Sequence, residues 1–132
     1  VLGSAMFSSG LSEFFANGIG NLLNGYSIFI VMLGIATFSI ALGALASNTA
    51  TAAILVPVII PLASLLNFSP KTLTMLGGIA VSLDFLLPVG TPPNAIAYAT
   101  GKVSIKEMLK VGILLTMVSI FILVIVARFL WI

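Results

Sequence analysis

Two polar clusters interrupt an otherwise apolar sequence, and their groups have the chemistry to bind ions. The first is Ser-Asn-Thr-Ala-Thr at residues 47–51, and the second is Pro-Val-Gly-Thr-Pro-Pro-Asn at residues 88–94. Hydroxyl, amide and unpaired backbone carbonyl oxygens are ligands for Na⁺, while the free N–H groups at a helix start favour an anion. Together the clusters predict an ion-binding site.

Each cluster also has a purely structural interpretation. Asn48 could cap a helix or join a packing hydrogen bond, and taken alone it favours neither interpretation. Ser47 and Thr49 flank it, however, and Thr91 and Asn94 follow downstream. Irregular polar backbone inside apolar sequence is tolerated where protein buries it or where it lines an aqueous cavity. Two such breaks in one chain therefore favour binding over packing.

Asp84 is a third candidate because it lies in apolar sequence four residues before Pro88. A carboxylate inside a membrane is costly and usually functional, so Asp84 is a possible ion-coupling carboxylate for a proton or a cation. A position near the membrane surface, or a role in pairing, is equally compatible with the sequence. Glu13 and Glu107 are expected to be solvated at the membrane interface.

Composition identifies the solvent in which these clusters must work. The chain has 132 residues, of which 61% are hydrophobic and 6% are charged. A soluble domain has roughly 45–50% apolar and about 25% charged residues. Because so few charges cannot coat a water-exposed surface, the fold class is predicted to be an all-α polytopic membrane protein in a lipid bilayer.

The same composition excludes several functions. The chain has no cysteine or histidine and only three acidic residues, so disulfides, thiolate metal sites and most acid–base catalysis lack their parts. We therefore expect no enzyme and no cofactor. The net charge of +2 results from five basic and three acidic residues, and the basic residues form no dense patch, which argues against nucleic acid as a partner.

The first 25 residues predict two short helices. Residues 1–11 are typical of the end of a membrane helix that stops at Gly10, and the start at Val1 within apolar sequence suggests a piece of a longer protein. Residues 12–25 predict an amphipathic helix that begins at Ser12, ends at Gly25 and lies in the membrane interface.

Residues 28–66 allow two topologies. They could be two membrane spans joined by a surface turn, or a re-entrant hairpin whose tip, residues 47–51, lies within the membrane. The second apolar arm, residues 52–66, is short for a span, and no basic residue flanks the turn. Small residues before the tip also allow close backbone packing, so the hairpin is favoured.

The remaining sequence predicts a discontinuous helix, a loop and a last span. Residues 72–100 form an apolar helix that is expected to unwind at residues 88–94, because adjacent prolines break a helix. Residues 101–110 are rich in lysine and are expected to be a cytoplasmic loop, followed by a transmembrane helix over residues 111–132. The location is then a plasma membrane, with loop 67–71 and the C-terminus outside.

The two clusters and their order resemble the divalent anion–sodium symporter family, which carries dicarboxylates, citrate or sulfate. Residues 47–51 resemble its second Ser-Asn-Thr motif, and residues 82–96 resemble its C-terminal signature. The resemblance covers nearly the whole chain. It implies half of an inverted-repeat transporter with a re-entrant hairpin and a broken helix, which forms a homodimer and works as an elevator. The N-terminal repeat would be missing from this chain.

The resemblance also assigns roles to single residues. It implies a small anionic substrate and sodium as coupling ion. The implied substrate-binding residues are Ser47, Asn48, Thr49, Thr91 and Pro92. The implied sodium-binding residues are Gly43, Ala46, Asn48, Gly90 and Pro92, mostly through backbone carbonyls.

The sequence departs from the family pattern at several positions. Gly43-Ala44-Leu45 stands where the family often has Thr-Glu-Phe, and Val81, Ala97 and Asp84 replace common signature residues. Sodium coupling could therefore be altered, or replaced by exchange or by protons. The alternatives are an anion exchanger or arsenite-type permease of the same superfamily, and a structural membrane subunit that transports nothing.

Overall fold

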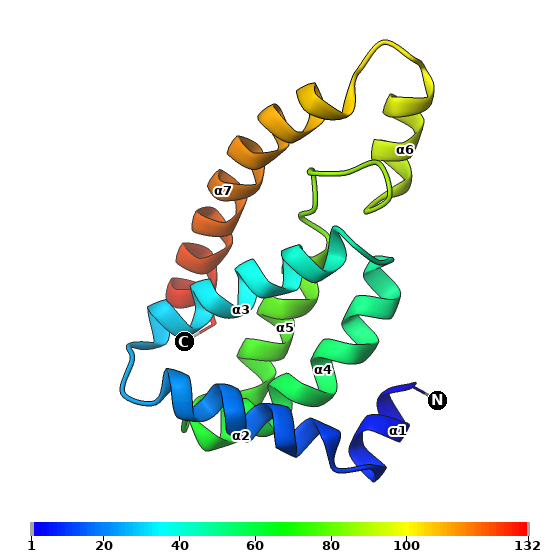
Figure 1. The fold of residues 1–132 in the computed structure, drawn as a ribbon. Coiled ribbons are helices and arrows are strands. Elements are labelled where there is room, and N and C mark those ends of the chain that lie inside the picture. Colours follow the sequence, from blue (N-terminus) through cyan, green and yellow to red (C-terminus); the bar gives the residue numbers. More distant parts are fainter. Residues whose placement is uncertain (1, 132) are drawn as a thin grey trace.

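The computed structural model describes residues 2–131, and all regular secondary structure in that range is helical (Figure 1). This confirms the all-α prediction. The helices, in chain order, are α1 (Leu2–Ser8), α2 (Leu11–Leu23), α3 (Ile28–Gly43), α4 (Asn48–Leu65), α5 (Pro70–Val81), α6 (Pro92–Ala99) and α7 (Ile105–Leu130).

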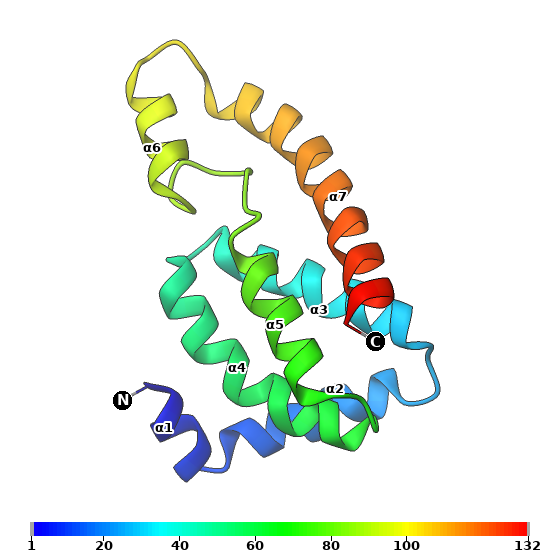
Figure 2. The same ribbon diagram turned by 180° about the vertical axis from the view of Figure 1, so that it is seen from behind.

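Helix α5 is the centre of the packing. It lies against both α3 and α4, while α2 packs on α4 and α7 contacts α3 and α5 (Figures 1 and 2). A Cβ atom built at Gly77 of α5 would lie 2.6 Å from Ile59 Cδ1 of α4 and 3.4 Å from Ser39 Oγ of α3. Glycine at this position therefore allows α5 to sit closely between the two arms.

Glycines end the first elements as expected, but the contact face of α2 differs from its apolar pattern. Gly10 and Gly25 have φ of 74° and 86°, the left-handed region that glycine adopts readily. Gly10, rather than Ser12, precedes the first turn of α2.

The buried residues of α2 are its small ones, Ser12, Ala16 and Gly20, while its phenylalanines are exposed. Small residues bring helix axes close, whereas large apolar ones are solvated by lipid.

The turn between α3 and α4 lies at residues 44–47, so residues 48–51 form the first turn of α4 rather than the middle of the tip. The reason is a cap, because Ser47 Oγ accepts the Ala50 N–H at 3.3 Å. Helix α4 consequently has 18 residues, and by length and composition it and α7 could each cross a membrane. The second arm is therefore not too short, and that argument for a re-entrant hairpin is lost.

The broken helix has a longer interruption than the sequence suggests. Helix α5 ends at Val81 and α6 begins at Pro92, so the non-helical segment is residues 82–91 instead of 88–94. Pro92 and Pro93 occupy the first turn of α6. Proline is tolerated there because the first N–H groups of a helix have no internal partner. The two prolines therefore begin a helix rather than break one.

Helix α7 begins at Ile105, six residues before the expected start of the last span. Ser104 and Glu107 form a capping box, in which the Ser104 N–H donates to Glu107 Oε2 at 2.8 Å and the Glu107 N–H donates to Ser104 Oγ at 3.3 Å. At the other end, Thr72 Oγ1 donates to the Trp131 carbonyl at 3.4 Å. The start of α5 and the end of α7 therefore lie together.

Candidate functional site

The hairpin tip and the interruption of the broken helix lie at the same end of the molecule (Figure 1). We call residues 44–49, which are the turn and the first two residues of α4, the tip, and residues 82–91 the unwound segment. A Cβ atom at Gly43 would lie 3.2 Å from the Val81 carbonyl and 3.6 Å from Asn48 Oδ1. Gly43 is buried in this contact, so its lack of a side chain lets the tip approach the end of α5.

The tip exposes hydrogen-bond donors at the start of α4. Within residues 2–131, the backbone N–H groups of Asn48 and Thr49 donate to no protein acceptor, as expected for the first turn of a helix. Asn48 is half-buried, and its Oδ1 atom is buried without a hydrogen-bond partner. Ser47 and Thr49 are exposed. The tip therefore offers unpaired amide, hydroxyl and N–H groups.

The unwound segment, by contrast, is tied together by its own side chains. Asp84 is fully buried and its Oδ1 atom accepts the Leu86 N–H at 2.9 Å. The Asn94 side-chain amide donates to the carbonyls of Asp84 and Leu87, at 3.2 and 3.0 Å. The Gly90 N–H donates to Leu87 at 3.3 Å. These bonds join the segment to the first turn of α6.

The second carboxyl oxygen of Asp84 makes no hydrogen bond to the described residues. Asp84 Oδ2 is buried and lies against Gly90, where it occupies the place that a Cβ atom would take. An unpaired buried oxygen is rare and calls for an explanation. The sequence placed Asp84 within a helix, whereas the structure places it in the unwound segment beside Gly90.

Several backbone carbonyls at the two breaks are unpaired. No N–H within the described range donates to the carbonyl of Ala46 or of Gly90, and Gly90 is buried. The Gly43 carbonyl accepts the Ala46 N–H at 3.3 Å, which leaves it a second lone pair. Such oxygens fit a hard cation.

At the start of α6, Thr91 is half-buried and its side chain makes no capping hydrogen bond. Pro92 follows and is exposed. No hydrogen bond joins Thr91 to the tip within the part of the chain described. The structure thus brings Gly43 to Asn48 and Asp84 to Gly90, while the Thr91 hydroxyl caps no helix.

Gly112 on α7 is a residue that the sequence analysis missed. It is buried, and a Cβ atom there would overlap the Phe85 carbonyl and lie 3.2 Å from the Leu86 Cα atom. Helix α7 therefore packs directly on the backbone of the unwound segment. A glycine in an apolar helix is the one signal that could have pointed to this contact.

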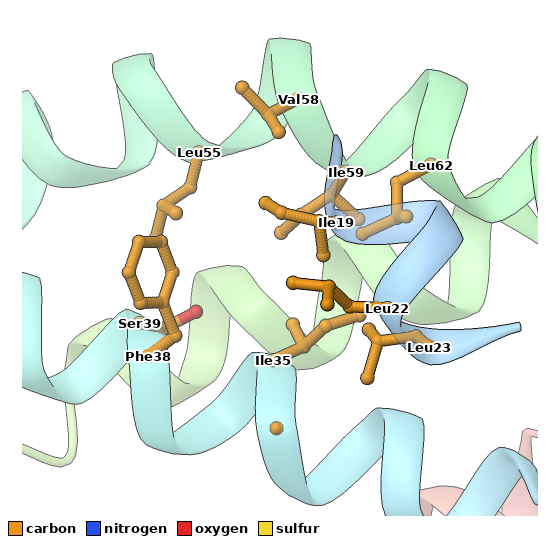
Figure 3. Close-up of a pocket in the computed structure, with 11 residues that line it drawn as sticks. Ile19, Leu22, Leu23, Ile35, Phe38, Ser39, Leu55, Val58, Ile59 and Leu62 are labelled. Carbon is orange, nitrogen blue, oxygen red and sulfur yellow. The ribbon is translucent and has the colours of Figure 1, made fainter. Parts of the chain in front are cut away.

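A separate cavity of about 260 Å³ lies between α2, α3 and α4 (Figure 3). Leucine, isoleucine, valine and phenylalanine side chains point into it, and Ser39 is the only labelled residue that carries an oxygen. An anion needs several donors to replace its water. This cavity therefore fits apolar groups and is not a candidate for the anion site.

The whole sequence, residues 1–132, matches the family described as the sodium:sulfate symporter transmembrane region. The chain belongs to this family. Over 97% of the chain it is 39% identical to a sodium-dependent dicarboxylate transporter, SdcS, of Staphylococcus saprophyticus, and covers 25% of that protein. It is 33% identical to SdcS of Staphylococcus aureus over 97% of the chain and 24% of that protein.

A further relative is described as an uncharacterized transporter of Haemophilus influenzae, with 38% identity over 98% of this chain and 28% of that protein. The chain thus spans about a quarter of the length of the curated relatives that it matches. The family predicted from the sequence is confirmed. Since these relatives are named as transporters, the comparison points away from catalysis.

Proposed function

We propose that a full-length protein carrying this chain is a secondary active transporter that moves a divalent anion across the plasma membrane, coupled to sodium. The substrate class is a di- or tricarboxylate, such as succinate or citrate, or sulfate. The observation that carries the proposal is the approach of the tip, which has free donors and a free carbonyl at Ala46, to the end of α5, from which the chain leads to the free carbonyl of Gly90. The names of the relatives support the same chemistry.

The tip is the part proposed to hold the anion. The free N–H groups of Asn48 and Thr49 and the positive end of α4 favour negative charge. The Asn48 amide and the hydroxyl of Thr49 can add hydrogen bonds, and Ser47 positions the turn through its cap. Thr91 and Pro92 are proposed to border the same anion from the other break. Neutral donors of this kind suit carboxylates and sulfate alike.

The unwound segment, with the end of the tip, is proposed to hold sodium. Hard oxygen ligands come from the free carbonyls of Ala46 and Gly90 and from the buried Asn48 Oδ1 atom. The backbone carbonyls of Gly43 and Pro92 are proposed to complete the set. Pro92 and Pro93 have no N–H, so the start of α6 presents fewer donors to an anion than the start of α4. Asp84, which lies against Gly90, is proposed to act on the site of this coupling ion through that contact.

The proposal includes an arrangement in the membrane. Residues 28–66 are proposed as a re-entrant hairpin in one of two inverted repeats, within a homodimer that moves as an elevator. Residues 101–110 would be cytoplasmic and the C-terminus outside. The hydrogen bond between Thr72 and Trp131 supports placing loop 67–71 and the C-terminus on one side.

The test is uptake of labelled succinate and sulfate into proteoliposomes that contain the full-length protein. We expect uptake to require an inward sodium gradient. Counterflow without sodium would instead indicate an exchanger or an arsenite-type permease. Absence of uptake of every divalent anion, with or without sodium, would reject the proposal in favour of a structural subunit.

A further inference from the structure

The carboxyl group of Asp84 and the missing side chain of Gly90 occupy the same space. Asp84 Oδ2 lies where a Cβ atom of residue 90 would be, and Asp84 Cγ would be 2.7 Å from that atom. Both residues are buried, so the Asp84 side chain cannot turn outward into solvent unless the backbone moves. An alanine at position 90 and an aspartate at position 84 therefore exclude one another.

The hydrogen bonds of the unwound segment hold this pair in place from both sides. The Leu86 N–H donates to Asp84 Oδ1 at 2.9 Å, and the other carboxyl oxygen, Oδ2, lies against Gly90. Asn94 holds the Asp84 carbonyl, and the Gly90 N–H is bound to Leu87. The position of the Gly90 backbone is thus set by Asp84 through direct contact.

We infer that Asp84 and Gly90 are a matched pair, in which Asp84 is a positioning residue that places the Gly90 carbonyl for the coupling cation. This inference rests on the proposed function, because Gly90 is a proposed sodium ligand. It assigns Asp84 a role through its volume and its Oδ1 hydrogen bond, rather than through its charge. The Gly90 carbonyl is free of hydrogen bonds within residues 2–131, as a ligand would be.

Four variants of the full-length protein test the pair: Gly90→Ala, Asp84→Ala, the double variant, and Asp84→Asn. Gly90→Ala should lower sodium-driven uptake by at least about tenfold, because overpacking a dense site disfavours the native geometry. The double variant should be nearly as active as Asp84→Ala, since the methyl group added at position 90 enters the space that the Asp84 carboxyl group leaves. Gly78→Ala is the matched control, because nothing lies within 4 Å of its added Cβ atom.

The decisive measurement is the sodium concentration for half-maximal succinate uptake, compared with the maximal rate. Asp84→Ala should raise this concentration several-fold, and Asp84→Asn should lie closer to the wild type, because it keeps the volume and the Oδ1 acceptor. If Asp84→Asn behaves like Asp84→Ala, the charge matters and the inference is wrong. It is also wrong if the double variant is no better than Gly90→Ala.

Thermal unfolding of the same variants in detergent separates this inference from the proposed function. If the wild type shows no sodium-driven uptake, the proposed function fails. Even then, the double variant should unfold at a higher temperature than Gly90→Ala alone, because residues 84 and 90 compete for the same space. If the variants alter only unfolding and leave the sodium dependence unchanged, the positioning role is rejected.

Discussion

The tip and the unwound segment both interrupt helical structure, yet they are stabilised in different ways. The unwound segment is joined to itself by Asp84 and Asn94, and each of these side chains bonds backbone groups within it. At the tip, Ser47 makes one capping bond and Asn48 Oδ1 is buried without a partner. We infer that the unwound segment is held by these bonds and by the packing of α7 at Gly112, whereas the tip depends on a ligand or on the rest of the protein.

This difference agrees with the proposed division of labour. A cation site needs carbonyls held at fixed positions, and the unwound segment provides that of Gly90. An anion site needs free donors that are paired only when the ligand arrives, and the start of α4 provides those. Substitutions that affect one break at a time should separate these roles, with an effect on stability that falls from Gly112→Ala through Asn94→Ala to Ser47→Ala.

Gly112→Ala should have the largest effect, because its methyl group would overlap the Phe85 carbonyl of the unwound segment. We expect a loss of about 3 kcal/mol of folding free energy, the upper end for overpacking. Gly34→Ala in α3 is the control, since nothing lies within 4 Å of its added Cβ atom. That change should stabilise the helix by about 0.5–1 kcal/mol. Thermal unfolding in detergent measures both, and equal effects would refute the contact.

Asn94→Ala should destabilise the unwound segment by about 2 kcal/mol, because it leaves the Asp84 carbonyl without a donor and the Leu87 carbonyl with only the Gly90 N–H. Asn48→Ala at the tip should leave the unfolding temperature unchanged, since it removes an oxygen that has no partner. The two variants are measured side by side by thermal unfolding without substrate. A larger loss for Asn48→Ala than for Asn94→Ala would reverse the comparison.

Ser47→Ala and Ser69→Ala form a matched pair with a smaller effect. Ser47 accepts the Ala50 N–H at 3.3 Å and Ser69 accepts the Thr72 N–H at 3.4 Å, so each caps one helix. Each change should cost about 1 kcal/mol of stability. Only Ser47→Ala should also raise the KM for succinate, because only α4 begins at the proposed anion site. A similar rise for Ser69→Ala would show that the effect is indirect.

Much of the fold follows from local signals in the sequence. The ends at Gly10 and Gly25, the apolar helices and the existence of both breaks are predictable, because glycine conformation and hydropathy act within a few residues. The limits of the unwound segment are not predictable from the sequence, since Pro92 is as compatible with the first turn of a helix as with a break.

The contacts between elements are harder to predict. Apolar periodicity marks the phenylalanines of α2, but Ser12, Ala16 and Gly20 face the protein, because lipid solvates large apolar groups as well as a core does. The pairing of Asp84 with Gly90 and of Gly112 with Phe85 depends on irregular backbone. No periodic pattern describes such backbone, so these contacts appear only in three dimensions.

The most direct test of the proposed site is sodium-driven succinate uptake by the full-length protein carrying Asn48→Ala. We expect uptake at low succinate to fall by at least about tenfold, since a hydrogen bond to a charged ligand contributes about 1.5–3 kcal/mol. The thermal stability of the unliganded protein should stay the same. Wild-type uptake by Asn48→Ala, with the same sodium dependence, would contradict the assignment of the tip as the anion site.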